Sequence, residues 1–420
     1  MPCYYAIERE KHAQYVRDNR RTVNLYEGIT DPVQILKIMH APLKYDELIQ
    51  YVPYEKTQEE LYLMLDDAQM KELESYAKSM CHSMIKPKEQ RHQGLEILLC
   101  LSCYCDYPMS DHTLQLVLDT NFVSFTSMLR HASASFRNRL LEQIKHDQSN
   151  RRILLLALAW VGDDTVANQF NEWRKNPPSW GSEFHVPVQD YSYEAGWELT
   201  AEGKRKNLFI PVNYAIEKRE ISQEDQSQEI QSQGRQYSTN NDGFSLLEAS
   251  QQPCPWCGGE LTKLLELDSR HVAVQALHWP HPVITIETCM VCSAYDVIFM
   301  EVNERGESVW SKYNHEPDYL PDNMDESVSD TTPNYSFSLS KQPRGVYHGT
   351  EWILGGALTQ IGGHPAWIQD AYYPKCPCCE KSMICLGQID YDWVMDGNEG
   401  IYYILVCPDD RITTTLFQQT

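Results

Sequence analysis

Apolar side chains in the first 176 residues recur at helical spacing. Over residues 59–84, leucine, methionine, tyrosine and alanine return about every 3.6 residues, and charged residues fill the positions between them. Four shorter apolar segments of the same kind follow at 94–104, 112–118, 122–129 and 136–144. The pattern predicts that this part of the chain is α-helical.

The strongest helical signal is the apolar run 153–161, which Gly162, Asp163 and Asp164 separate from a second helical pattern at 167–173. Glycine ends helices because it tolerates a left-handed backbone, and aspartate caps the start of the next helix. This turn is typical of a HEAT-type repeat, although no fixed period recurs along the chain. We predict an α-helical, HEAT-like layer over residues 1–176.

The composition changes after this layer. Residues 177–214 are rich in aromatic side chains, proline and glycine, which predicts an irregular connection that packs onto both halves. Residues 222–241 are mostly glutamine, serine and asparagine, so burial cannot offset their ordering entropy. This stretch is interpreted as a linker, with a disordered recognition segment as the alternative. The predicted domains are therefore an α-helical domain with its connection (1–215), a linker (216–250) and a β-rich domain (251–420).

The second half has the pattern of strands and turns. β-branched and aromatic runs, bounded by proline, glycine, asparagine and aspartate, occupy residues 272–277, 283–287, 295–302 and 401–406. With the helical first half, they predict an α+β protein.

Cysteine pairs at metal-binding spacing occur among these strands. Cys254 and Cys257 form one Cys-x-x-Cys, and Cys289 and Cys292 form another. Two such turns supply four thiolates to one tetrahedral zinc ion, with the predicted strands 272–277 and 283–287 as the hairpin of a zinc ribbon. A site with four thiolates leaves no position for water, which indicates a structural role. A redox dithiol or a set of free thiols is the alternative.

Composition and charge narrow the classes of partner. The chain is 42% hydrophobic and 23% charged, which is typical of a globular protein. Thirty-six Lys and Arg against 59 Asp and Glu give a net charge of −23, which disfavours nucleic acid and anionic membranes and favours a basic protein as partner. The first residues lack an export signal, and the longest apolar run is too short to span a bilayer. We therefore expect a cytoplasmic protein.

Acidic residues are concentrated in residues 316–330, which contain no Lys or Arg. Carboxylates interleaved with apolar side chains suit an interface in which charge steers a basic partner and apolar groups anchor it. A solvated loop is the simpler alternative. The candidate partner-binding residues are Glu316, Asp318, Tyr319, Leu320, Asp322, Asp325 and Glu326.

The last third of the chain carries an ordered series of motifs. Gly362-Gly363-His364-Pro365-Ala366-Trp367 is followed by Cys376 and Cys379, then by Leu386-Gly387-Gln388-Ile389, and then by an apolar run into Cys407-Pro408. The series resembles the bacterial YwqG-like family, and a related arrangement occurs in the programmed cell death protein two family. The resemblance covers about residues 253–420. It implies a β-rich, zinc-supported fold without established enzymatic activity and, in the eukaryotic relatives, chaperone-like binding of a basic ribosomal protein.

The chain departs from that pattern at Asp410, where related ribbons carry a second cysteine after the final Cys-Pro. The second predicted zinc site is therefore Cys376, Cys379 and Cys407 with Asp410 as the fourth ligand. Asp409 or Cys378 in that position, or loss of the metal, are the alternatives. Three thiolates with a weak fourth ligand could leave zinc with a water, as a hydrolase needs. No residue of the sequence is indicated as a general base. The sequence also contains none of three common catalytic or nucleotide-binding motifs, namely H-E-x-x-H, a phosphate-binding loop and G-x-S-x-G.

These observations favour a non-catalytic, cytoplasmic binding protein that sequesters a basic protein. Its most concrete form is a bacterial immunity protein that neutralises a cognate toxin domain. The alternatives are a chaperone of a ribosomal protein and a zinc-dependent hydrolase centred on Cys376, Cys379 and Cys407.

Overall fold

The computed structural model describes residues 2–81, 88–120, 122–220, 243–321, 335–354, 358–394 and 399–419. Helices and sheets are both extensive, which confirms the predicted α+β class. The chain divides into two compact units, Met1–Thr120 and Asn121–Thr420. This division differs from the predicted domains 1–215, 216–250 and 251–420. Residues 121–215 belong to the same unit as the large sheet, and strand β5 (Asn213–Glu220) crosses the predicted boundary at 215.

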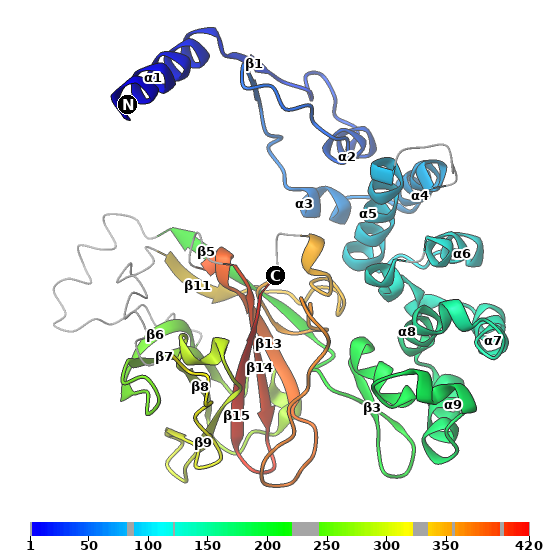
Figure 1. Cartoon of the computed structure of the whole chain (residues 1–420), viewed down its shortest axis with the longest axis vertical. Helices are drawn as coiled ribbons and strands as arrows, with labels where there is room; N and C mark the ends of the chain where they lie inside the picture. Colours follow the sequence, from blue (N-terminus) through cyan, green and yellow to red (C-terminus); the bar gives the residue numbers. More distant parts are fainter. Residues whose placement is uncertain are drawn as a thin grey trace. The chain divides into compact units, whose positions relative to one another are not determined.

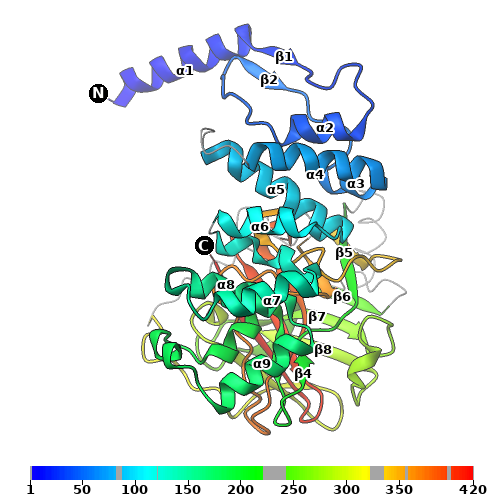
Figure 2. The same ribbon diagram turned by 90° about the vertical axis from the view of Figure 1, so that its right-hand side faces the viewer.

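The first unit is mainly helical (Figure 2). Its elements are α1 (Pro2–Asn19), β1 (Arg21–Val23), α2 (Pro32–Met39), β2 (Ile49–Tyr51), α3 (Gln58–Leu63), α4 (Asp67–Cys81), α5 (Lys88–Cys105) and α6 (Asp111–Asp119). Helices α4 and α5 approach closely at Gly94, where an added Cβ would lie 2.8 Å from the carbonyl oxygen of Ala77. The sequence pattern correctly predicted helix here but not its division.

The single helix predicted over 59–84 is two helices. The Asp66 side chain accepts from the backbone N–H of Gln69 at 2.8 Å, and the Gln69 side chain accepts from the N–H of Asp66 at 3.0 Å. This reciprocal capping satisfies backbone donors at the start of a helix, so α4 begins anew after α3 has ended. Residues 82–84 of the predicted segment lie outside the described residues.

The second unit begins with helices and short 3-10 turns. These are η1 (Val123–His131), α7 (Ala134–Gln143), η2 (Gln148–Asn150), α8 (Arg151–Val161), α9 (Asp164–Lys175), η3 (Ser179–Glu183) and η4 (Val188–Ala195). Gly162 ends α8 with φ +48°, and the Asp163 side chain accepts from the N–H of Val166 at 3.0 Å, as the sequence predicts. The indole of Trp197 donates to the carbonyl of Ala159 at 2.8 Å and ties α8 to the strands that follow.

Strands make up most of the rest of this unit (Figure 1), with the 3-10 turns η5 (Gln275–Leu277), η6 (Cys292–Ala294) and η7 (Trp352–Leu354) and the short helix α11 (Tyr391–Val394). A large antiparallel sheet has the order β10-β9-β15-β14-β13-β12-β5-β11, and a second sheet has the order β6-β7-β8. Outside these two sheets, β3 (Trp197–Leu199) pairs with β4 (Arg205–Asn207). The remaining strands are β6 (Phe244–Pro253), β7 (Glu260–Asp268), β8 (Val283–Thr288), β9 (Ile298–Val302), β10 (Ser308–Trp310), β11 (Tyr335–Leu339), β12 (Gln360–Gly362), β13 (Ile384–Asp390), β14 (Ile401–Cys407) and β15 (Ile412–Gln418).

The core lies on both faces of the large sheet. Along β14, Tyr402, Ile404 and Val406 join the cluster that includes Ile284 and Ile286 of β8. The alternate side chains of β14 join a second cluster on the opposite face, with Phe209, Trp367 and Tyr373. A strand buried on both faces reads as a continuous apolar run, which is why 401–406 is apolar throughout.

The strand predicted over 272–277 is instead a sequence of turns that ends in η5 (Gln275–Leu277). The N–H groups of Val274 and Gln275 donate to the carbonyl of His271, and Val274 and Leu277 are buried. The turns therefore bury Val274 and Leu277 without a strand, while Val272 is 48% exposed. The predicted helix 122–129 falls in η1. Among the described helices, none combines the length and apolar character that a bilayer crossing requires.

Candidate metal centres and an acidic cavity

The first cysteine quartet converges on one point. The Sγ atoms of Cys254 and Cys292 are 3.7 Å apart, those of Cys257 and Cys289 are 3.5 Å apart, and all four lie within 4.8 Å of one another. A disulfide needs about 2.05 Å. Thiolates at about 2.3 Å from a tetrahedral ion lie about 3.8 Å from each other, so this spacing fits a metal ion.

Backbone turns hold the quartet in place. After β6, the N–H of Cys254 donates to the carbonyl of Gly259 at 2.7 Å, and the N–H of Gly258 donates back to the carbonyl of Cys254 at 2.9 Å. After β8, the N–H of Cys292 donates to the Sγ of Cys289 at 3.4 Å. Hydrogen bonds from the Cys289 and Cys292 thiols lower the pKa of Cys254, and the same bonds raise the pKa of Cys289 and Cys292, so these three thiols titrate as one coupled set.

The second cluster repeats the first turn. The N–H of Cys376 donates to the carbonyl of Lys381 at 2.8 Å, and the N–H of Glu380 donates to the carbonyl of Cys376 at 2.8 Å. Glu380 has φ +60° and occupies the place that Gly258, with φ +76°, occupies in the first cluster. The Sγ atoms of Cys379 and Cys407 are 3.7 Å apart. The same local backbone therefore presents two thiolates in both clusters.

Asp410 takes the fourth position of this cluster. Its Oδ2 lies 3.1 Å from the Sγ of Cys376 and 3.4 Å from that of Cys407, and the four ligand atoms lie within 4.8 Å of one another. It follows Cys407 at the spacing of a Cys-x-x-Cys turn. The neighbouring candidates point elsewhere, because Asp409 pairs with Lys381 at 2.7 Å and the Cys378 Sγ lies 3.5 Å from the Tyr313 hydroxyl.

Asp410→Cys should strengthen metal binding at this cluster. A fourth thiolate at the same position completes the soft ligand set that zinc prefers in closed sites. We expect the variant to retain its second ion against a chelator at least about tenfold longer than the native protein. Asp409→Cys is the matched control, because its side chain faces Lys381. Equal retention by both variants would contradict the assignment of Asp410 as a ligand.

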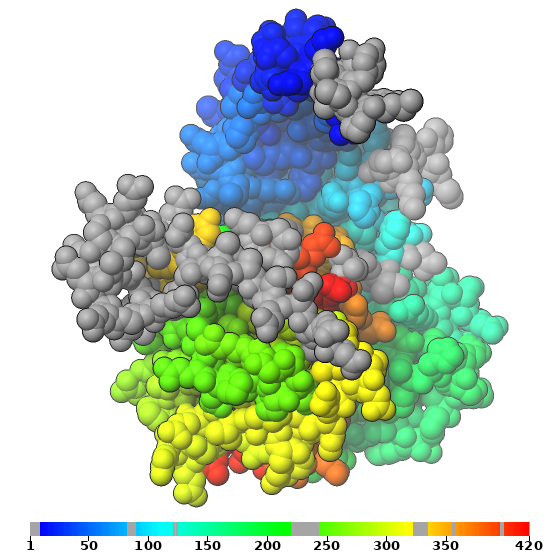
Figure 3. Space-filling view, turned by 60° about the vertical axis from the view of Figure 1, so that its left-hand side comes forward, coloured from blue at the N-terminus to red at the C-terminus, as the bar shows by residue number. Residues whose placement is uncertain are grey.

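The predicted acidic surface is only partly described. Glu316, Asp318 and Tyr319 are exposed, and the Tyr319 hydroxyl donates to the carbonyl of Tyr295 at 2.7 Å. Leu320 is half-buried and packs against the first cysteine cluster. Figure 3 shows the yellow part of the chain, around residue 300, beside the green part that includes β6. Leu320 therefore packs on the side chains around the first cysteine quartet, and its role as an anchor for a partner stays a prediction. The other candidates, Asp322, Asp325 and Glu326, lie outside the described residues.

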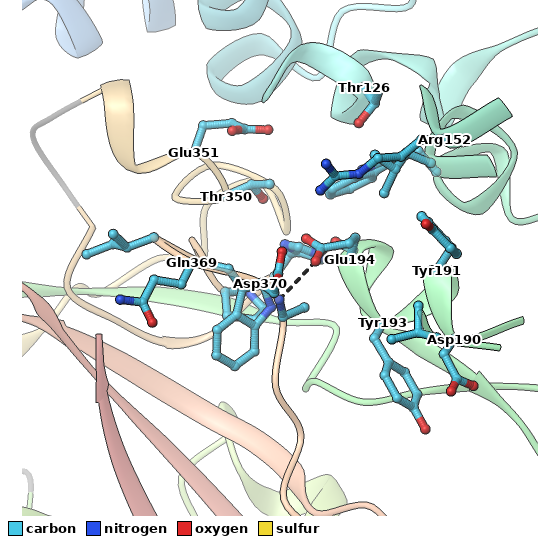
Figure 4. Close-up of a pocket in the computed structure, with 18 of the residues that line it drawn as sticks. Thr126, Arg152, Asp190, Tyr191, Tyr193, Glu194, Thr350, Glu351, Gln369 and Asp370 are labelled. Atoms are coloured by element: carbon cyan, nitrogen blue, oxygen red, sulfur yellow. Dashed lines mark hydrogen bonds between the residues drawn. The ribbon is translucent and has the colours of Figure 1, made fainter. Parts of the chain in front are cut away.

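A cavity of about 840 Å³ lies within the second unit, remote in sequence from most predicted site residues. Arg152, Leu156 and Trp160 line it from one face of α8, because they are spaced four residues apart. The rest of the wall comes from η1, from η3 and η4 with the loop between them, from η7 (Trp352–Leu354) and the turn before it, and from the loop after β12. Figure 4 shows Arg152, Glu194, Glu351 and Asp370 around one space.

The Gly-Gly-His-Pro motif forms part of this wall. Gly362 and Gly363 have φ of +69° and +75°, and an added Cβ at Gly362 would lie 1.8 Å from the carbonyl oxygen of Val212. Only glycine fits such a position. The two glycines turn the chain so that His364, which is 1% exposed, lines the cavity and its Nε2 lies 3.1 Å from the carbonyl oxygen of Glu194.

Buried polar side chains of the sheet fasten the same loop. The Gln388 side chain accepts from the N–H of Ala366 at 2.7 Å and donates to the carbonyl of Leu358 at 2.8 Å. The Tyr403 hydroxyl accepts from the N–H of Ile368 at 3.1 Å and donates to the carbonyl of Ala366 at 2.5 Å. The motif series noted in the sequence thus builds the cavity wall as well as the second cysteine cluster.

Carboxylates dominate the charge of the cavity. Five acidic side chains line it, of which Glu183 is paired with Arg151 at 2.7 Å. Burial raises the pKa of Glu351 to about 8 and also raises the pKa of Glu194 and Asp190. Such shifts show that water solvates these groups poorly. Glu351 therefore keeps its proton near pH 7 until a cation beside it lowers its pKa, so binding of a cation and ionisation of Glu351 are coupled. The five are Glu183, Asp190, Glu194, Glu351 and Asp370.

Sequence reasoning did not find this cavity. Its acids are scattered over two distant segments, and no spacing rule links Glu194 with Glu351. The available signals were the aromatic-rich stretch 177–214 and the paired glycines before His364. The first was interpreted as a connection and the second as part of a motif series. The two segments line one cavity only in the folded chain.

Comparison with known proteins gives one relationship over the full chain. The chain is 31% identical over 424 residues to the uncharacterized protein YpfL of Salmonella typhimurium, a match that covers 100% of this chain and 93% of YpfL. The chain belongs to the YpfL family. Both units of this YpfL family member take part in the relationship, since the match spans them. No family model matches the chain, and no solved structure matches it.

Proposed function

We propose that this YpfL family member is a non-catalytic binding protein that holds a basic partner protein. The observation that carries the proposal is the cavity, a volume of about 840 Å³ lined by five carboxylates and several aromatic rings. A cavity with this lining suits a cationic group with an apolar stem, such as a basic side chain. The net charge of −23 adds a long-range field that steers a cationic protein toward the molecule.

The proposed ion of both cysteine clusters is zinc, in a structural role. Thiolate-rich tetrahedral sites select zinc over harder divalent ions. The first cluster has four thiolates within 4.8 Å of one another, a closed set that supports folding rather than chemistry. On this proposal the clusters act as zinc-ribbon elements that brace the β-rich part of the chain, and the helical part acts as a HEAT-like layer.

The partner proposed most concretely is a toxin domain that this protein would neutralise as an immunity protein in the cytoplasm. Occlusion needs a rigid, acidic surface and no catalytic set. The distant resemblance to the YwqG-like and programmed cell death protein two families supports the alternative of a chaperone for a basic ribosomal protein. A zinc-dependent hydrolase at Cys376, Cys379 and Cys407 would require Asp410 to give way to water, whereas its carboxylate lies 3.1 Å from the Cys376 Sγ.

Capture from the native cell tests this proposal. The tagged protein should recover a stoichiometric basic protein, and their association rate should fall by at least about tenfold between 50 and 500 mM salt, because screening shortens the field. The double variant Glu351→Gln/Asp370→Asn should weaken the complex by about tenfold or more.

A control with the same change of net charge is Glu142→Gln/Glu172→Gln. Both glutamates lie on exposed helix surfaces of the second unit and pair with Lys145 and Lys175. Equal weakening by both double variants would show that net charge, rather than the cavity, determines binding. Recovery of no stoichiometric partner would contradict the proposed function.

A further inference from the structure

The cavity presents hydrogen-bond acceptors that have no protein donor. The Nε2 of His364 lies 3.1 Å from the carbonyl oxygen of Glu194, which can only accept, so Nε2 carries the proton. Burial lowers the pKa of His364 to about 3, so the ring is neutral and its Nδ1 is a bare acceptor. Among the described residues, this Nδ1 finds no hydrogen-bond partner.

A second buried polar group in the wall is the Thr350 hydroxyl, which can accept or donate. Thr350 is 5% exposed, and its Oγ1 has no hydrogen-bond partner among the described residues, nor has the Nε1 donor of Trp367. Buried polar atoms without a protein partner are met by water or by a ligand group. The carboxylates of Glu351 and Asp370 add acceptors, and Arg152 is the one Lys or Arg among the described lining residues. A ligand with several N–H groups would satisfy the His364 Nδ1, the Thr350 hydroxyl and the carboxylates together.

The aromatic rings that line the cavity favour a planar donor, because a flat group can stack on them. Tyr191, Trp352 and Trp367 line the cavity, and Trp352 is 39% exposed. A planar guanidinium stacks on such rings and donates from five N–H groups, whereas an ammonium is compact and strongly hydrated.

The rim of the cavity already contains this arrangement. Arg151 donates to both carboxylate oxygens of Glu183 at 2.8 and 2.7 Å, and its guanidinium lies 5.3 Å from the ring centre of Trp180. Glu183 itself lines the cavity. Glu351 and Trp352 also line the cavity, so a carboxylate and a ring are present there as well, and the charge of Arg130 partly offsets the rise in the pKa of Glu351.

We propose that the cavity is a receptor for a guanidinium group, presented as an arginine side chain of a bound protein. This assignment rests on the proposed function for the source of the arginine, and on the cavity alone for its chemistry. The guanidinium donates to Glu351, Asp370 and the free acceptors of Thr350 and His364, while its alkyl stem packs on the aromatic wall.

Titration of the full chain with capped amino acids tests the chemistry directly. Nα-acetyl-arginine amide should bind and change the fluorescence of the tryptophans that line the cavity. The lysine derivative should bind at least about fivefold more weakly, and the citrulline derivative, a neutral isostere, at least about tenfold more weakly. Free L-alanine tests whether Arg152 instead recognises the carboxylate of an amino acid.

Variants assign the effect to the cavity. Glu351→Gln and Thr350→Val should each weaken binding of the arginine derivative, by about tenfold and about threefold, whereas Glu142→Gln should leave it unchanged. Equal binding of the lysine or citrulline derivative, equal binding of L-alanine, or no binding at all would overturn the proposal. So would an equal effect of Glu142→Gln.

The two proposals fail in distinguishable ways. If a basic partner is captured while none of the capped amino acids binds, the guanidinium receptor is refuted and the proposed function stands. If the arginine derivative binds selectively but no partner protein is recovered, the cavity assignment stands and the proposed function is refuted.

Discussion

Replacing Cys257 with serine should remove about one metal ion per chain and destabilise the second unit by about 4 kcal/mol or more. Its Sγ is one of four that lie within 4.8 Å of one another, and metal binding to such a quartet is coupled to folding. The loss of structure should begin around the first cysteine quartet. Trp256 and Trp310 pack against this cluster, with ring centres 5.2 Å apart, so their fluorescence should report it.

Elemental analysis and denaturant unfolding followed by tryptophan fluorescence measure the two effects. Cys378→Ser is the matched control, because Cys378 is exposed and belongs to neither ligand set. We expect about two ions in the native protein and in the control, and about one in Cys257→Ser. Unchanged metal content and stability in Cys257→Ser would refute the first metal site.

Gly362→Ala should be the most damaging small substitution in the cavity wall, with a loss of about 3 kcal/mol or more. Gly362 has φ +69°, a region that costs an L-residue about 1–2 kcal/mol. The larger effect is steric, because the new Cβ would lie 1.8 Å from the carbonyl oxygen of Val212, and backbone cannot move as a flexible side chain can. His364 should shift with the distorted turn, so the arginine derivative should also bind more weakly.

Gly258→Ala separates the two contributions. Gly258 has φ +76°, but a Cβ there would meet no heavy atom within 4 Å, and Glu380 adopts the equivalent backbone in the second cluster. We expect this variant to lose only about 1 kcal/mol. Both variants belong to the second unit, so the shifts of one unfolding transition can be compared. A similar loss for both would mean that the contact with Val212 is relieved at little cost.

Local chemistry made several features predictable from the sequence. The turn of Gly162 and Asp163 depends only on backbone preference and capping, and the structure has it as expected. The first quartet follows from thiolate chemistry and from two Cys-x-x-Cys turns, whereas Asp410 was placed by the resemblance to related ribbons, which carry a cysteine there. The capping turn and each Cys-x-x-Cys turn are local signals, so no knowledge of the tertiary fold was needed for them.

In other elements, local sequence preference and packing against distant residues favour different structures. Only the folded chain shows which of them forms. The helix predicted over 59–84 divides at Asp66 because a capping interaction outweighs a continuous apolar period. The segment 272–277 has the composition of a strand, yet turns bury Val274 and Leu277. The boundary expected at 215 falls inside β5, because composition does not show which strands will pair across the linker.

The sequence by itself determined the α+β class, the ligand types of both cysteine clusters and the strongly acidic charge, since these depend on residue identity and short spacing. The existence of the cavity follows only from the tertiary structure. Glu194 of η4 and Glu351, which precedes η7, line one cavity together with residues of α8 and of the loop after β12. Their raised pKa values come from burial that no sequence pattern encodes, because burial is a property of everything that packs around a side chain.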